Sequence, residues 1–287
     1  MKIGVTGATG QLGKLVVEKL KSRGVADSVV ALVRNKEKAS ELGVESRTFD
    51  YTQPEVLVEA LKGIDHLLLI SSSEVGQRAV QHKNVIEAAK AAGVKWIVYT
   101  SLLHATDSSM GLAPEHVETE ELLVESGISF TILRNGWYSE NYFNSLQGAL
   151  QHGKIIGCAG DGKISSATRS DYADAAVSVL LSEGHEGNTY ELAGDDSFTM
   201  SDLAAELSRQ SGKAIVYENL PEEAYVEALK EMGLPEFVAQ LLGNMDAGTS
   251  RNDLFDESRQ LSHLTGKPTT PMSATIQSFL ASVGDAE

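Results

Sequence analysis

The stretch that decides the fold is Gly7-Ala8-Thr9-Gly10-Gln11-Leu12-Gly13, which lies between a short apolar run and a helical pattern. This order is the one that a dinucleotide-binding strand–turn–helix unit requires. Gly7 permits the tight turn, Gly10 lets the backbone approach a pyrophosphate, and Gly13 lets the helix pack against the strand. The N–H groups that begin the helix would then face the phosphates. We therefore predict a dinucleotide site, the alternative being a glycine turn that holds no ligand.

Apolar runs and helical patterns alternate through the rest of the first half. The runs are rich in Val, Ile and Leu, which is typical of strands buried on both faces of a parallel sheet. We predict strands over Ile3 to Thr6, Val29 to Val33, Val44 to Phe49, Leu67 to Ile70, Trp96 to Thr100 and Phe130 to Leu133. Helices are predicted over Leu12 to Lys21, Pro54 to Leu61, Gln77 to Ala92 and Glu115 to Glu125. Because crossovers between parallel strands are right-handed, this order predicts an α/β fold with a Rossmann-type doubly wound sheet.

The pattern changes after about Tyr138, where a helix and then a glycine-rich segment at 153–162 interrupt the alternation. Further on, the sequence predicts helices over 171–181, 199–210 and 221–232, and strands over 189–192 and 215–217. We predict an NAD(P)-binding domain over residues 1–150 with returning segments at about 165–195. A smaller, mostly helical, substrate-binding part is predicted over residues 196–287.

Composition narrows the class of protein. The chain has 287 residues and a formal net charge of −16, and an acidic chain binds polyanions poorly, so we expect neither nucleic acid nor an anionic membrane as partner. The N-terminus lacks the apolar region of a signal peptide, and no apolar run suggests membrane insertion, so we expect a cytoplasmic protein. The one cysteine, Cys158, excludes an internal disulfide and a cysteine-based metal site, and no other metal-ligand spacing is present. The sequence does not decide whether the protein forms a homodimer.

The end of the second predicted strand indicates which dinucleotide binds. An NAD site commonly has an acidic residue there for the ribose 2′-hydroxyl, whereas this chain has Val33-Arg34-Asn35-Lys36. An arginine can hold a 2′-phosphate with two hydrogen bonds, so Arg34 predicts NADPH; the alternative is a solvated charge at a helix start. Asp50, after the third strand, is predicted to meet the adenine amino group or to cap a helix.

The catalytic pattern of short-chain dehydrogenases is missing. Those enzymes use a Tyr-x-x-x-Lys motif, in which tyrosine donates the proton and lysine lowers its pKa, and none of the eight tyrosines here has a lysine four residues on. In register, Leu112 falls at the tyrosine position and His116 at the lysine position. We consider two roles for His116: a proton donor or anion stabiliser at the reduced oxygen, or a hydrogen-bonded helix histidine. His82 and His104 are expected to be structural.

Two further segments lie at predicted strand ends, where such sheets bind ligands. Ser71-Ser72-Ser73 can reach the ribose or nicotinamide side of a cofactor. Asn135-Gly136-Trp137-Tyr138 follows the sixth strand, and Trp137 and Tyr138 could form walls for a flat aromatic substrate or could belong to the core.

Several of these stretches resemble the NmrA-like, atypical short-chain dehydrogenase group, in particular its quinone-reducing members. The resemblance covers most of the chain and is weaker after about residue 220. It rests on the glycine turn, Val33-Arg34-Asn35, Ser71-Ser72-Ser73-Glu74-Val75-Gly76-Gln77-Arg78, Tyr99 to Ala105, Arg134 to Asn141, Ala159 to Lys163 and Glu191 to Asp195.

The resemblance implies a two-domain fold, an NADPH site and two-electron reduction of a small quinone without flavin. It also implies cofactor contacts, which fall on Gly7, Ala8, Thr9, Gly10, Gln11, Leu12, Arg34, Ser71, Ser72, Ser73, Asn135, Gly136, Trp137, Tyr138, Ser139 and Glu140. The missing tyrosine is compatible with this activity, because hydride addition to a quinone gives a phenolate. Three alternatives stay open: an NADP(H)-binding sensor without turnover, a reductase of triphenylmethane-type dyes and, less favoured, a sugar-nucleotide epimerase or dehydratase.

Overall fold

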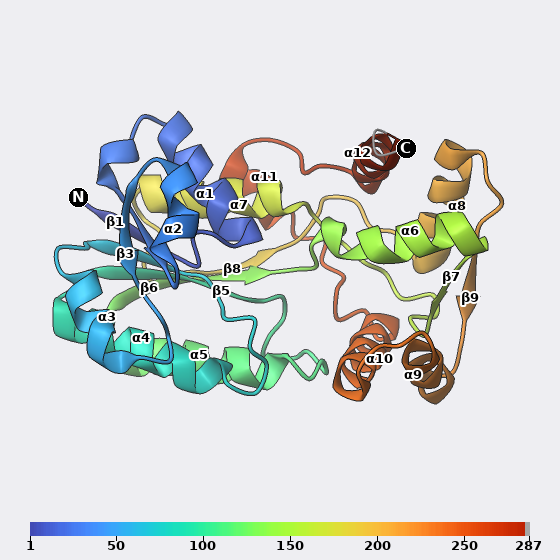
Figure 1. Ribbon diagram of the computed structural model, residues 1–287, viewed down its shortest axis with the longest axis horizontal. Coiled ribbons are helices and arrows are strands. Elements are labelled where there is room, and N and C mark those ends of the chain that lie inside the picture. Colours follow the sequence, from blue (N-terminus) through green and yellow to red (C-terminus); the bar gives the residue numbers. More distant parts are fainter. Residues whose placement is uncertain (285–287) are drawn as a thin grey trace.

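A computed structural model describes residues 1–284, and its main element there is a seven-stranded parallel sheet in the order β3-β2-β1-β4-β5-β6-β8 (Figure 1). The sequence prediction of a Rossmann-type doubly wound sheet is confirmed. The order reverses between β1 and β4, which is the switch point where such sheets bind ligands at the carboxyl ends of the strands. The strands are β1 (Ile3–Thr6), β2 (Val29–Val33), β3 (Glu45–Thr48), β4 (His66–Leu69), β5 (Trp96–Leu102), β6 (Ser129–Asn135) and β8 (Thr189–Leu192).

Helices cover both faces of this sheet. On one face lie α1 (Gln11–Ser22), α7 (Arg169–Leu181) and the short α11 (Gln260–Thr265). On the other face lie α3 (Pro54–Leu61), α4 (Arg78–Ala92) and α5 (Ala113–Ser126). The short α2 (Lys36–Ala39) and the 3₁₀ turns Ala26–Ser28, Ser40–Leu42 and Ser139–Tyr142 complete the connections. The sequence pattern was too short to predict α2, which Asn35 caps by accepting a hydrogen bond from Glu37 N–H.

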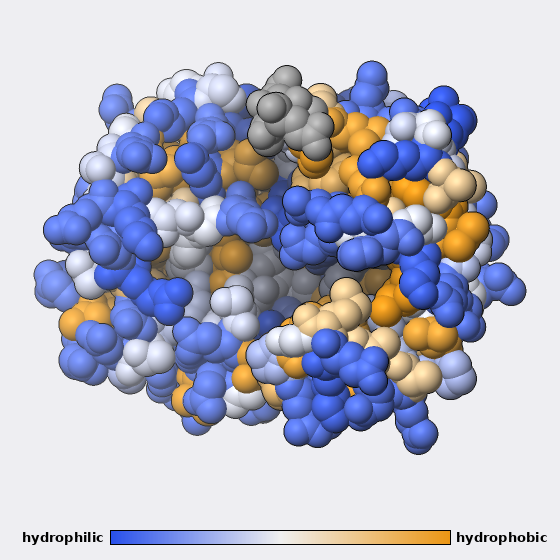
Figure 2. Space-filling view, turned by 45° about the vertical axis from the view of Figure 1, so that its right-hand side comes forward, coloured by the Kyte–Doolittle hydropathy of each residue, from blue (hydrophilic) through white to orange (hydrophobic). Residues whose placement is uncertain are grey.

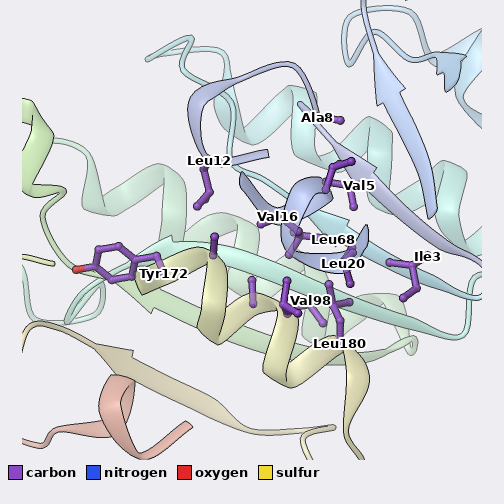
Figure 3. Packing of buried hydrophobic residues seen from close by; sticks show 14 of the residues in the cluster. Ile3, Val5, Ala8, Leu12, Val16, Leu20, Leu68, Val98, Tyr172 and Leu180 are labelled. Atoms are coloured by element: carbon purple, nitrogen blue, oxygen red, sulfur yellow. The ribbon is translucent and has the colours of Figure 1, made fainter. Parts of the chain in front are cut away.

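The main core lies between the sheet and the helices α1 and α7. Figure 3 shows Val5, Val16, Leu20 and Leu68 from the sheet and α1 packed against the α7 side. These side chains are completely buried, and burying an aliphatic side chain contributes roughly 1.5–3 kcal/mol. This core holds the glycine turn in place, because β1 and α1 are both anchored in it.

A second group of elements forms a smaller lobe, drawn on the right of Figure 1. It comprises α6 (Phe143–His152), β7 (Lys154–Gly157), α8 (Met200–Ser211), β9 (Val216–Asn219), α9 (Glu222–Glu231), α10 (Glu236–Ser250) and α12 (Met272–Gly284). The lobe is mostly helical, and β7 and β9 pair in parallel across a long stretch of chain. We propose that the smaller domain also includes α6 and β7. The helix α11, in contrast, packs against α7 and β8 and so belongs to the dinucleotide-binding domain.

A recess separates the two lobes on the face shown in Figure 2. The carboxyl ends of β5 and β6 point toward the smaller lobe, so the segment predicted to bind after β6 lies at the junction (Figure 1). Across residues 1–284, none of the helices is both long and apolar enough to cross a membrane.

Candidate functional site

The glycine turn joins β1 to α1 with the geometry that its residues predict. Gly7 has a φ of +56°, in the left-handed region that glycine enters without strain. A Cβ on Gly13 would lie 2.3 Å from the Gly7 carbonyl oxygen, so any other residue would separate the helix from the turn. Ala8 is buried beneath the turn and Leu12 packs into the core (Figure 3), while Thr9 and Gln11 are exposed.

The start of α1 suits an anion. Gly10, the N-cap residue that precedes the helix, supplies no side-chain cap, and the first turn contains no acidic residue. The first N–H groups of the helix therefore have no intrahelical acceptor, and the helix dipole favours a negative charge at this point. Because Gly10 has no Cβ, a phosphate group can approach the backbone N–H groups at the start of the helix. The residues at the turn fit the pyrophosphate of a dinucleotide.

Arg34 lies directly after β2, beside the glycine turn. Its side chain is 71% exposed, and its Nη1 atom lies 3.2 Å from Oε1 of Glu74, which belongs to the loop after β4. The guanidinium is accessible and has donors left over, as a 2′-phosphate would require. No acidic residue follows β2 directly, since Asn35 and Lys36 come next.

Asp50 has a local structural role. Its Oδ1 accepts hydrogen bonds from the backbone N–H and the hydroxyl of Thr52, at 3.0 and 2.8 Å. These bonds stabilise the turn before α3 but do not cap that helix, whose N-cap residue is Gln53 and which has no side-chain cap hydrogen bond. The helix-capping alternative is therefore not found, and the contact with adenine stays a prediction. The neighbouring Tyr51 donates through its hydroxyl to Thr6 Oγ1 and to the Ile70 carbonyl oxygen, and so links the ends of β1 and β4. Sequence reasoning did not single out this link.

The loop Ser71 to Ser73 is held through its backbone. Ser71 N–H donates to Thr100 Oγ1 and Ser72 N–H donates to His82 Nε2, both at 2.9 Å. Ser71 and Ser72 are half-buried and Ser73 is exposed, and the hydroxyl of Ser72 accepts a hydrogen bond from Glu74 N–H at 3.2 Å. The Nε atom of Arg78, buried at the start of α4, donates to the Ser72 carbonyl oxygen at 2.7 Å. Sequence reasoning quoted Arg78 in the resemblance but gave it no such role.

The segment after β6 divides between the lobes. Trp137 packs on the core of the smaller lobe, whereas Tyr138 packs on the main core and stacks edge-on with Tyr172. The two rings therefore lie apart, and the prediction that both form walls of one substrate pocket stays untested. Gly136 is needed because a Cβ would lie 3.0 Å from the Tyr172 hydroxyl and 3.1 Å from the Leu192 carbonyl.

Asn135 offers an unused hydrogen-bond acceptor at this junction. The residue is 5% exposed, its Nδ2 lies 3.4 Å from the Tyr138 hydroxyl, and its Oδ1 has no partner within residues 1–284. An unpaired buried acceptor costs about 1–3 kcal/mol, which a ligand donor such as an amide or hydroxyl would recover. The carboxylate of Glu140, in contrast, accepts from Arg169 N–H at 3.0 Å, so its side chain is committed to the start of α7.

Ser139 is likewise engaged within the protein. Its hydroxyl lies 2.8 Å from that of Ser166, and its N–H donates to the Ala167 carbonyl oxygen at 2.9 Å. The hydroxyl of Ser139 and the carboxylate of Glu140 thus already make hydrogen bonds within the protein, and their predicted contacts with the cofactor stay a prediction.

His116 is a buried histidine on α5. It is 5% exposed, and its Nδ1 lies 2.7 Å from the hydroxyl of Tyr99, a fully buried residue of β5. Burial first, and then the positive charge of Arg78, lower the pKa of His116 to about 3, so the imidazole is neutral near pH 7. These observations favour the hydrogen-bonded helix histidine of the two roles considered, and they leave a neutral ring unsuited to donating a proton.

A buried ionic network was missed by sequence reasoning. Arg134 of β6 forms ion pairs with Glu120 of α5 at 2.6 Å and with Glu191 of β8 at 2.8 Å. The hydrogen bonds that Arg134 donates, first to Glu120 and then to Glu191, raise its pKa. The network joins the carboxyl ends of β6 and β8 to α5. The only signal in the sequence is a charged residue inside an otherwise apolar run.

The fold and this site define a nicotinamide-dinucleotide-binding protein, and comparison with known proteins agrees. The model of the family described as NAD(P)H-binding matches residues 7–183. The chain belongs to this family. Within the described residues no group of three or more His, Cys, Asp or Glu side chains could hold a metal ion.

The similar proteins are more specific. The chain is 56% identical to quinone oxidoreductase 2 of Escherichia coli strain K12 over 277 residues, covering 96% of this chain and 97% of that protein. A crystal structure of that NADPH-dependent enzyme with NADPH superposes with a TM-score of 0.95, covering 97% of this chain and 99% of the other. A triphenylmethane reductase of Citrobacter sp. superposes with a TM-score of 0.93 at 38% identity, covering 98% and 100%.

Proposed function

We propose that this protein is an NADPH-dependent quinone oxidoreductase that passes a hydride from NADPH directly to a small quinone, without flavin. The observation that carries the proposal is the 56% identity to a quinone oxidoreductase along nearly the whole of both chains. The residues of the site support it, because the glycine turn and Arg34 stand together at the switch point of the sheet. The proposal also includes a quinone as the small-molecule partner, no binding of nucleic acid and assembly as a homodimer. The cytoplasmic location stays a prediction.

The cofactor would be held at three places. The turn from Gly7 to Leu12 would receive the pyrophosphate, Arg34 the 2′-phosphate, and Asn135 a donor group on the nicotinamide side. When bound, NADPH supplies the two electrons and the hydrogen as hydride, and the protein supplies position and exclusion of water. The loop Ser71 to Ser73, after β4, would contact the ribose or the nicotinamide between these two ends.

The missing Tyr-x-x-x-Lys motif supports a quinone over an alcohol or ketone. Reduction of an isolated ketone produces an alkoxide and needs a strong proton donor in the transition state. A quinone becomes a phenolate, which is a far weaker base, so hydride transfer can proceed without that tyrosine. The buried, neutral His116 does not replace it.

The experiment mixes the purified protein with NADPH and a simple benzoquinone, and follows the absorbance of the reduced nicotinamide. NADH in place of NADPH tests selectivity, and a sample without protein measures the unaided reaction. NADPH-selective oxidation without added flavin is the expected result. Tight NADPH binding without oxidation would contradict the proposal and favour the NADP(H) sensor.

Reduction of triphenylmethane-type dyes is a second candidate activity. The 38% identity and full coverage of the Citrobacter enzyme favour it, since both chains share the same fold at high similarity. A cationic dye accepts hydride at a carbocation and needs no proton. Decolorisation of such a dye in the same assay tests this activity directly.

A further inference from the structure

A histidine–aspartate pair lies at the carboxyl edge of the sheet, just beyond β5. His104 Nε2 lies 3.2 Å from Asp256 Oδ2, and Asp256 comes from the segment between α10 and α11. A carboxylate in this place fixes the orientation and the tautomer of the imidazole, as it does for histidines that transfer protons. The sequence predicted a structural role for His104, and the following observations indicate a different one.

The backbone of His104 is held in a strained conformation. Its φ of +52° lies in the left-handed region, which costs a residue with a side chain roughly 1–2 kcal/mol. Its N–H donates to Glu191 Oε2, and its carbonyl oxygen accepts from Asp107 and Ser108, each at 2.8 Å. Strain of this kind persists where the surrounding structure imposes it, and it is concentrated at functional sites.

His104 is also next to the segment assigned to the cofactor. Leu103 N–H donates to the Asn135 carbonyl oxygen at 3.0 Å, so His104 lies one residue beyond the point where β5 and β6 meet. Its side chain is 30% exposed, whereas His82 and His116 are closed off in the core. Within residues 1–284 its second ring nitrogen, Nδ1, has no hydrogen-bond partner. That nitrogen is free for a ligand.

Building on the proposed function, we propose that His104 donates a proton to the reduced quinone, with Asp256 as the positioning residue. Two electrons and one hydrogen pass as hydride from NADPH to the quinone, which leaves NADP⁺. As negative charge develops on the quinone oxygen in the same step, the N–H bond at Nδ1 of His104 breaks and an O–H bond forms on that oxygen, so that the hydroquinone is produced. His104 then takes its next proton from solvent.

The test uses variants that keep the local backbone. His104→Asn is suitable because asparagine tolerates the left-handed region better than other residues with a side chain. Asp256→Asn removes the negative charge of the partner. His152→Asn, at an exposed position in the last turn of α6, is the matched control. Unfolding midpoints and NADPH affinity, measured for each variant, show whether the fold and the cofactor site are intact.

Two hydride acceptors separate proton donation from a structural role. A benzoquinone needs both a hydride and a proton, whereas a triphenylmethane cation needs only the hydride. We expect His104→Asn to lower kcat for the quinone by about 100-fold, and Asp256→Asn by about tenfold, with little change for the dye. Equal losses for both acceptors, or no loss for the quinone, would overturn the assignment.

A binding measurement gives a readout that does not depend on turnover. 4-Nitrophenol carries a phenolate oxygen like that of the product, and its absorbance reports whether that oxygen is ionised. Protonated His104 should favour the phenolate, so His104→Asn should weaken its binding to the NADP⁺ complex about tenfold, and His152→Asn should not. Unchanged binding would contradict the proposal. A wild-type protein that reduces no quinone at all would instead refute the proposed function, and this inference with it.

Discussion

Arg34 offers the sharpest test of how the chain selects its cofactor. Its side chain is 71% exposed, and its only ion pair in the described structure is with Glu74, at 3.2 Å. Replacing Arg34 by alanine removes the one guanidinium beside the ribose end of the predicted site. The change leaves the core untouched, because the residue lies beyond the last buried position of β2. Any loss should therefore be specific to a ligand that carries a 2′-phosphate.

The expected loss of NADPH affinity depends on how exposed the Arg34 guanidinium is and on its competing ion pair with Glu74. A hydrogen bond to a charged group contributes about 1.5–3 kcal/mol. Solvent screens an exposed guanidinium, and Glu74 competes for it, so we take the lower part of this range, about 1.5–2 kcal/mol. That free energy corresponds to a loss of roughly 12- to 30-fold in kcat/KM for NADPH. Glu74→Gln removes the competitor and should raise kcat/KM for NADPH about twofold.

The assay measures kcat/KM for NADPH and for NADH at one ionic strength, with a fixed quinone. Arg209→Ala is the matched control, because Arg209 is 69% exposed and also pairs with a glutamate, Glu206, but lies in the smaller lobe. We expect the loss with Arg34→Ala for NADPH only. Equal losses for both cofactors, or the same loss with Arg209→Ala, would refute the reasoning.

Three further substitutions test the turn, the buried histidine and a buried carboxyl. Gly13→Ala should abolish measurable NADPH binding, because its Cβ would lie 2.3 Å from a carbonyl oxygen, whereas Gly148→Ala, with no atom within 4 Å, should leave fluorescence titrations unchanged. His116→Ala should lower the free energy of unfolding in urea by about 1–3 kcal/mol by leaving the Tyr99 hydroxyl unpaired, and should change kcat little; a thousandfold loss of kcat would restore a catalytic role. Burial raises the pKa of Asp246 to about 6 from 3.8, so the folded state loses stability as pH rises between these values. Relative to wild type, Asp246→Asn should therefore gain about 1–3 kcal/mol between pH 4 and pH 7 in the same unfolding assay, and a constant difference would contradict it.

Much of the fold could be predicted from local patterns. The strands Ile3–Thr6 and Val29–Val33, and the helix Pro54–Leu61, begin and end at the residues that the sequence predicts. Runs of β-branched and aliphatic residues suit strands buried on both faces, and such runs can be recognised within a few residues. The glycine turn could be predicted for the same reason, since its spacing reflects contacts between residues close in the chain.

The pairing of distant segments was decided by the tertiary structure alone. The smaller lobe takes its parallel sheet from β7 and β9, which are separated in the chain by α7, by β8 of the main sheet and by α8 of this lobe. Trp137 and Tyr138, adjacent in the sequence, pack on different cores, because successive side chains of an extended segment point in opposite directions. Single-sequence patterns carry no information about which distant surface a side chain meets.

The candidate site divides in the same way. The sequence by itself determined the glycine turn and the cation at Arg34, because both depend on local spacing at the end of a strand. Only the tertiary structure decided which histidine is accessible. Burial against Tyr99 closes off His116, whereas His104 is brought to Asp256, 152 residues away, in a strained backbone that Glu191 helps to hold. The exposure of a side chain and its hydrogen-bond partners depend on packing between segments that are distant in the chain. The sequence alone does not show which distant segments pack together.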